Sequence, residues 1–179
     1  MSRLMSAPSR EAFPSRPRGR RSIRLPDHDY RQPGAYFVTI CTRNRAPTFG
    51  AVASGSIHLN AEGQVAQELW LAIPRHFPNV RLDVFVVMPD HIHGVLILQP
   101  LPDDRPRPRR FADAVPGSLS TIVGAYKAEV TKRVKALHDR AGVGQRRVGT
   151  VWQRNFYERV IRGPGELQAL RAYILHNPA

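Results

Sequence analysis

Hydrophobic and polar positions alternate with a period of two in several parts of the chain, and this period predicts β-strands. β-branched and aromatic residues predict one strand over residues 35–44 and another over 151–162. Two further apolar runs lie within 80–98 and are separated only by Pro89-Asp90 and a residue on either side. Since parallel strands need a crossover of about a dozen residues, these two runs are expected to pair antiparallel.

Apolar residues three and four positions apart predict amphipathic helices in three other segments. The first covers residues 61–75 with Asn60 as its expected N-cap, the second covers 118–140, and the third covers 166–177. Between 49 and 60, Gly and Ser residues separate short apolar pieces, which predicts a hairpin or a loop excursion. The remaining connections, expected on the surface, are residues 99–116 and 142–149.

The order of these elements is strand, helix, two strands, helix, strand, helix. It predicts an α+β fold, a ferredoxin-like sandwich in which helices pack on an antiparallel sheet. A chain of 179 residues is long enough for one such domain. Residues 1–33 are rich in Arg, Pro and Ser and lack apolar periodicity, so they are expected to form a basic flexible arm ahead of a folded domain over 34–179.

The charge balance points to a polyanionic partner. Lys and Arg number 27 against 14 Asp and Glu, which gives a formal net charge of +13 and a sequence pI near 11.2. A basic tail on a neutral enzyme would also raise the charge, but many basic residues lie within the predicted fold. Those assigned to phosphate contacts are Lys127, Arg133, Arg154 and Arg159.

The sequence has no features of a membrane or secreted protein. No run of about 18 apolar residues suggests a membrane span, and the first residues lack the apolar centre of a signal peptide. Cys41 is the only cysteine, so no intramolecular disulfide is expected. We therefore expect a cytoplasmic protein that works close to nucleic acid and without a membrane.

The candidate chemistry begins with His91 and His93, which lie in one of the predicted strands. Residues two apart in a strand share a face, so the two imidazoles are expected side by side, with Ile92 pointing into the core. Neutral imidazoles bind divalent metals, and a pair needs at least one further ligand. An isolated pair of this kind is also typical of an ordinary solvated sheet face.

The last predicted helix supplies partners for this pair. Tyr173 and Asn177 are four apart and therefore share a helix face next to the apolar stripe. In the resulting hypothesis, His91, His93 and Asn177 hold a divalent ion on a scissile phosphate. Tyr173 attacks phosphorus, forms a covalent phosphotyrosine and releases a 3′ hydroxyl.

Other tyrosines are weaker candidates for the nucleophile. Tyr126 falls within the apolar stripe of the second helix and is expected in the core. Tyr157, beside Phe156 on the last predicted strand, could reach the site but ranks below Tyr173. Tyr30 and Tyr36 have no expected ligand nearby.

Three stretches, VVMPDHIHGVLIL, WQRNFYERVIR and YILHNPA, resemble the HUH single-tyrosine transposases, in particular the REP-associated tyrosine transposases. The resemblance runs from about Tyr36 to the last residue. It implies a ferredoxin-like domain that binds hairpins of single-stranded DNA, uses Mg or Mn and forms a 5′-phosphotyrosine intermediate. In that pattern His91 and His93 match the paired metal histidines, Tyr173 the nucleophile and Asn177 the polar ligand.

Bacterial origin, association with the nucleoid and a homodimer are further expectations from this resemblance. The alternative is a non-catalytic or domesticated hairpin-binding protein that retains the fold, which the end of the sequence at Ala179 favours slightly. It predicts salt-dependent binding without a covalent adduct. A metal hydrolase of small phosphates is a third reading, which the charge of +13 disfavours.

Overall fold

The computed structural model describes residues 32–100, 116–142 and 150–177. The predicted arm over 1–33 lies outside these residues except for its last two positions, and so does most of both predicted surface connections. Within the described residues, no helix is long and apolar enough to cross a membrane.

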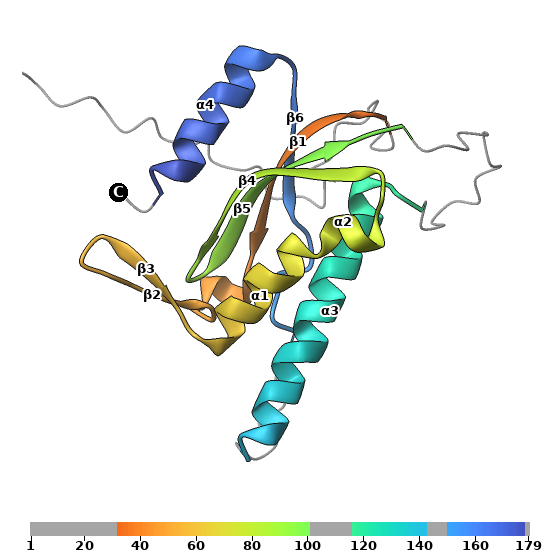
Figure 1. The fold of residues 1–179 in the computed structure, drawn as a ribbon. Helices are drawn as coiled ribbons and strands as arrows, with labels where there is room; N and C mark the ends of the chain where they lie inside the picture. Colours follow the sequence, from red (N-terminus) through yellow and green to blue (C-terminus); the bar gives the residue numbers. More distant parts are fainter. Residues whose placement is uncertain (1–31, 101–115, 143–149, 178–179) are drawn as a thin grey trace, which may run out of the picture.

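Four strands form one antiparallel sheet with the spatial order β4-β5-β1-β6 (Figure 1). The strands are β1 (Gly34–Cys41), β4 (Val80–Met88), β5 (His91–Leu98) and β6 (Tyr157–Ile161). The hairpin β4–β5 is the predicted antiparallel pair, joined at Pro89-Asp90. This arrangement confirms the expected α+β fold.

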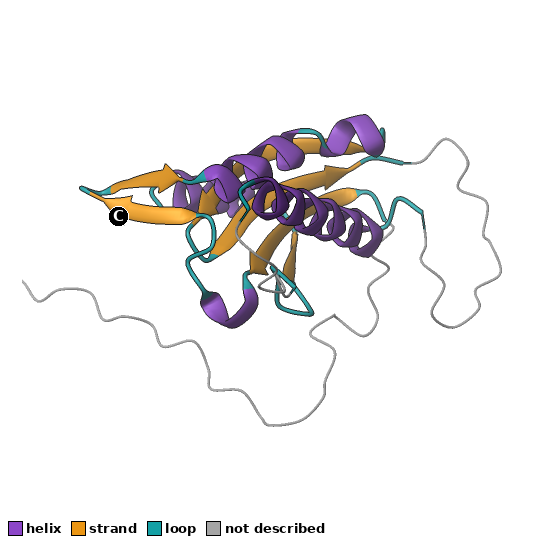
Figure 2. Ribbon diagram, turned by 90° about the horizontal axis from the view of Figure 1, so that it is seen from below, coloured by secondary structure: helices purple, strands orange, loops and turns teal. Residues whose placement is uncertain are grey.

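Helices cover both faces of the sheet (Figures 1 and 2). On one face lie α1 (Ala61–Leu71), the short α2 (Ile73–His76) and the long α3 (Leu119–Arg140). On the other face α4 (Pro164–Leu175) lies alone. The predicted excursion is a separate hairpin of β2 (Gly50–Ala53) and β3 (Ser56–Leu59), which projects from the body in Figure 1.

Three predicted elements are shorter than expected. The strand over 35–44 ends at Cys41, and a 3₁₀ turn, η1 (Arg43–Arg45), follows it. The helix over 61–75 divides at Ala72 because Pro74 has no N–H and its ring disfavours a continuous helix. The strand over 151–162 is limited to β6, and Trp152 forms only an isolated bridge with Thr42.

The core lies between the sheet and the pair α1 and α3. Its largest fully buried side chains include Trp70, Tyr36 and Ile92. The Tyr126 hydroxyl donates a 2.8 Å hydrogen bond to the Ala66 carbonyl, which confirms that Tyr126 belongs to the core. At Gly94 an added Cβ would lie 2.3 Å from the Trp70 ring, so only glycine lets this indole pack directly behind the strand that carries the histidines.

Candidate active site

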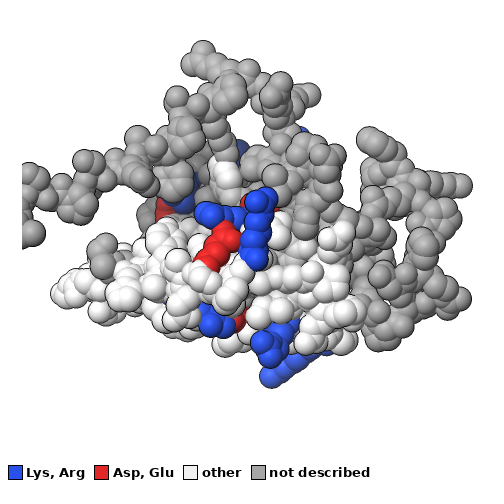
Figure 3. Space-filling view, turned by 90° about the horizontal axis from the view of Figure 1, so that it is seen from above, with Lys and Arg blue, Asp and Glu red and all other residues white. Residues whose placement is uncertain are grey.

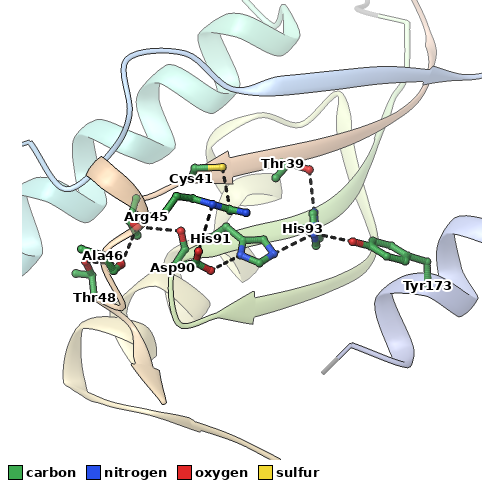
Figure 4. Close-up of polar contacts among 10 residues, drawn as sticks. Thr39, Cys41, Arg45, Ala46, Thr48, Asp90, His91, His93 and Tyr173 are labelled. Carbon is green, nitrogen blue, oxygen red and sulfur yellow. Dashed lines mark hydrogen bonds and ion pairs between the residues drawn. The ribbon is translucent and has the colours of Figure 1, made fainter. Parts of the chain in front are cut away.

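Strand β5 places His91 and His93 on the sheet face opposite the core. Ile92, between them, is completely buried on the other face, as the alternation of a strand requires. The antiparallel register sets Cys41 beside His91 and Thr39 beside His93. Both imidazoles therefore lie on the face that α4 covers (Figures 1 and 4).

The two rings converge through their Nε2 atoms, which are 3.0 Å apart. Each Nδ1 atom has its own partner: Asp90 Oδ1 at 2.5 Å from His91 and Thr39 Oγ1 at 2.8 Å from His93 (Figure 4). Because a carboxylate only accepts hydrogen bonds, Asp90 favours the tautomer of His91 with its proton on Nδ1, in which the Nε2 lone pair points toward His93.

The turn that carries Asp90 is fixed from two directions. The Thr42 hydroxyl and backbone N–H both donate to the Asp90 carbonyl at 2.9 Å, and the Phe49 N–H donates to the Pro89 carbonyl at 2.9 Å. The Arg45 guanidinium lies 3.3 Å from the second carboxylate oxygen of Asp90. The histidine pair therefore starts from a rigid turn.

His93 is the more buried imidazole, with 7% of its surface exposed. Burial lowers its pKa to about 4, and the neighbouring His91 and Arg45 act in the same direction while Asp90 opposes them. The Phe37 ring stacks on it with centroids 5.3 Å apart. His93 is therefore a neutral imidazole at neutral pH, which is the form that binds metals.

Helix α4 brings Tyr173 to this pair from 80 positions further along the chain. The Tyr173 hydroxyl is 3.3 Å from His93 Nε2, and the two rings meet edge to face with centroids 5.3 Å apart (Figure 4). About half of the Tyr173 side chain, 51%, is exposed. The phenol oxygen thus lies beside the imidazole nitrogens, on a residue that is about half exposed.

Asn177 lies just after the C-cap residue His176 of α4 and is half-buried. Its backbone N–H donates to the Ile174 carbonyl at 3.3 Å. Among the described contacts, no hydrogen bond of its side chain joins it to the histidine pair. Its role as a metal ligand stays a prediction.

No family model matches the sequence. An uncharacterized protein of Haemophilus influenzae (strain Rd) is 35% identical over 166 residues, which cover 89% of this chain and 88% of the other. The chain belongs to the same family as this protein.

The fold has a relative among solved structures, the REP-associated tyrosine transposase bound to a REP hairpin. The TM-score is 0.55 and the identity 22%, with 82% of this chain and 67% of the transposase chain covered. The chain has the fold of this tyrosine transposase, so the resemblance to the HUH single-tyrosine transposases is confirmed at the level of the fold.

Within this transposase fold, the histidine pair fits a divalent cation. Two ligands at right angles around an ion, each at about 2.1 Å, are about 3 Å apart; the Nε2 atoms are separated by 3.0 Å. The same separation suits a hydrogen bond between the rings, whose proton an ion would displace. No group of three or more His, Cys, Asp or Glu side chains placed to hold a metal occurs in the described part of the chain. Oxygen atoms from other sources would have to complete the site.

The four basic residues assigned to phosphate contacts lie in different surroundings. Lys127 directs its ammonium group to the carbonyls of Gln153, Arg154 and Asn155 at 2.6, 3.2 and 3.4 Å. Burial lowers the pKa of Lys127. This lysine therefore holds residues 153–155 in place, and its donors point into the protein.

The other three assigned residues are exposed on the surface. Arg159 Nε lies 2.5 Å from Glu166, and Arg133 Nε lies 3.7 Å from Glu129. On the face drawn in Figure 3, blue and red side chains lie close together. Roughly half of the basic residues lie outside the described ranges. DNA binding by Lys127, Arg133, Arg154 and Arg159 stays a prediction.

The sequence patterns did not identify the residues that contact and orient the two histidines. Asp90 directly precedes His91, and this adjacency was a usable signal for a carboxylate partner. Thr39 and Phe37 carry no such signal, because they reach His93 only through the register of β1 and β5.

Proposed function

We propose that the protein is a metal-dependent single-stranded DNA endonuclease and strand transferase, a transposase that acts on DNA hairpins through a covalent 5′-phosphotyrosine intermediate. The observation that carries the proposal is the position of the Tyr173 hydroxyl, 3.3 Å from His93 Nε2, beside the facing Nε2 atom of His91. The hairpin bound to the transposase of the same fold supports the choice of substrate.

His91 and His93 would hold the divalent ion, Mg or Mn, and Asn177 is the proposed polar ligand. When bound, the ion supplies positive charge that offsets the charge developing on the scissile phosphate. Asp90 and Thr39 keep the two rings oriented by their contacts with the Nδ1 atoms.

Tyr173 is the proposed nucleophile. Its oxygen forms a bond to phosphorus as the bond between phosphorus and the 3′ oxygen breaks. The phenol proton leaves to water, to which the half-exposed side chain is open, and the leaving 3′ oxygen takes up a proton. Attack by a second 3′ hydroxyl on the phosphotyrosine reverses these bonds, joins a new strand and restores the phenol.

The test uses a hairpin oligonucleotide with a labelled single-stranded flank and Mg or Mn. The wild-type protein is expected to form a covalent protein–DNA band under denaturing electrophoresis, and Tyr173→Phe is expected to abolish it. Tyr157→Phe is the matched control, because Tyr157 pairs with Thr39 across the sheet and is 36% exposed. A band of undiminished strength from Tyr173→Phe would defeat the assignment.

A non-catalytic hairpin-binding protein is the second candidate. It is favoured because, in the described part of the chain, no group of three or more His, Cys, Asp or Glu side chains is placed to hold a metal. It predicts hairpin binding that weakens steeply with salt and no covalent adduct with any divalent metal.

A further inference from the structure

Apolar packing attaches α4 to the sheet at few points. Ile174 is the one buried residue of this helix, and the neighbouring Leu175 is 71% exposed. The helix begins after Gly163, whose extended backbone links it to the edge strand β6. The position of Tyr173 over the histidines therefore needs a further constraint.

Arg171, two residues before Tyr173, makes that connection to β4. Its Nε lies 2.9 Å from Asp83 Oδ1 and its Nη2 lies 2.6 Å from Asp83 Oδ2. This is a two-pronged guanidinium–carboxylate pair, the geometry that gives an ion pair both strength and direction. The Asp83 side chain is only 10% exposed, and the Arg171 side chain is 38% exposed.

An irregularity in β4 aims Asp83 at the helix. The pairing of β4 with β5 shifts between Leu82 and Phe85, as in a β-bulge. Asp83 Oδ1 also accepts a 2.8 Å hydrogen bond from the Val84 N–H. Bulges commonly redirect a side chain next to a functional site. The hydrogen bonds from Arg171 lower the pKa of Asp83, so the carboxylate is charged at neutral pH.

We propose that the Asp83–Arg171 pair positions α4, and that it thereby sets the place of the Tyr173 hydroxyl beside His93. Asp83 and Arg171 are positioning residues: they touch each other, and they act through the helix. Glu166 pairs with Arg159 of β6 at the first turn of the helix, whereas the Asp83–Arg171 pair joins the later part of α4 to β4, next to the point where Tyr173 reaches β5. The effect on Tyr173 as the nucleophile rests on the proposed function, whereas the attachment of α4 to β4 does not.

The experiment compares Arg171→Gln, Arg171→Lys and wild type in the full chain. Hydrogen–deuterium exchange of the α4 amides is expected to be about tenfold faster in Arg171→Gln, because two charge-assisted hydrogen bonds are lost. Exchange in β5 is expected to stay unchanged. Arg171→Lys keeps the positive charge but cannot form the two-pronged pair, so the exchange rate of its α4 amides is expected to lie between those of wild type and Arg171→Gln. Gln168→Ala, an exposed change on the same helix, is the control.

The second readout is the rate of adduct formation on the hairpin oligonucleotide. In Arg171→Gln it is expected to fall about tenfold with an unchanged dissociation constant for the hairpin, and to recover partly in Arg171→Lys. Asp83→Asn is expected to reproduce the Arg171→Gln result, so the test survives if one variant folds poorly.

Wild-type exchange rates in α4 of both Arg171→Gln and Asp83→Asn would overturn the proposal. A loosened helix with an undiminished adduct rate would overturn the positioning of Tyr173. If the wild-type protein forms no adduct, the proposed function fails, and the exchange rates still decide whether this pair holds the helix.

Discussion

The two imidazoles of strand β5 are held in place by different neighbours. His91 is oriented by the Asp90 carboxylate, and His93 by a hydroxyl, an aromatic ring and burial. The phenol of Tyr173 then lies against the buried member of the pair. The orientation of each imidazole ring, and the ring nitrogen that carries its proton, therefore depend on the side-chain atom that contacts its Nδ1 atom.

The contact between Asp90 and His91 gives a prediction about metal binding. Asp90→Asn keeps a hydrogen-bond acceptor for His91 Nδ1 but removes the charge that Arg45 also contacts. Manganese affinity, measured by calorimetric titration, is expected to fall about tenfold, since partners of metal-bound histidines typically contribute a factor of 10 to 100.

The control for this change is Asp139→Asn, which removes an exposed carboxylate from α3. It lowers the negative charge by the same amount and is expected to leave manganese affinity at the wild-type value. Equal affinities for Asp90→Asn and wild type would exclude Asp90 as the group that orients a metal ligand.

Among the elements, β5 and α4 differ in how firmly they are held. Strand β5 pairs with β1 over its whole length and with β4 on both sides of the register shift, and Trp70 packs against Gly94 behind it. Helix α4 is held by buried Ile174, the Asp83–Arg171 pair, the contact of Tyr173 with His93 and, at its first turn, the pair of Glu166 with Arg159 of β6. The site thus combines a rigid strand with a helix attached at a few points.

This difference gives a prediction for acid. The pKa of Asp83 is lowered in the folded protein, so below its usual value the unfolded chain binds more protons at this group than the folded one. The contribution of the pair to stability is complete above about pH 4 and is lost as pH falls through the folded pKa. Over that range, the thermal midpoint of the wild type is expected to fall more steeply with pH than that of Asp83→Asn. Equal slopes of thermal midpoint against pH for the two proteins would show that the Asp83 carboxylate does not contribute to the pH dependence of stability.

The elements and the histidine pair could be predicted from the sequence because their patterns are local. Alternation places His91 and His93 on one face, and helix spacing places Tyr126 in the core. Asp83 and Arg171 are 88 positions apart and meet through a bulge that no periodicity marks. The charge of Lys127 predicts DNA contact, but its neighbours depend on where residues 153–155 pass along α3, which periodicity does not show.

For the whole molecule, the central feature is convergence of segments that are distant in the chain. β1 supplies Thr39 and Phe37, the turn before β5 supplies Asp90, and α4 brings Tyr173 to His93 across a separation of 80 residues. The helices α1 and α3 bury the opposite face, so the histidine pair and Tyr173 lie on the face that α4 covers. The formal charge of +13, which belongs to the whole chain, supports the proposed nucleic-acid substrate.

The most direct test of this account is to map the tyrosine that carries the DNA. Wild-type protein is incubated with manganese and a hairpin oligonucleotide, the adduct is digested, and the modified peptide is sequenced by mass spectrometry. We expect a nucleotide-5′-phosphate on Tyr173 and an unmodified Tyr157. A nucleotide on Tyr157 or on any residue other than Tyr173 would contradict it.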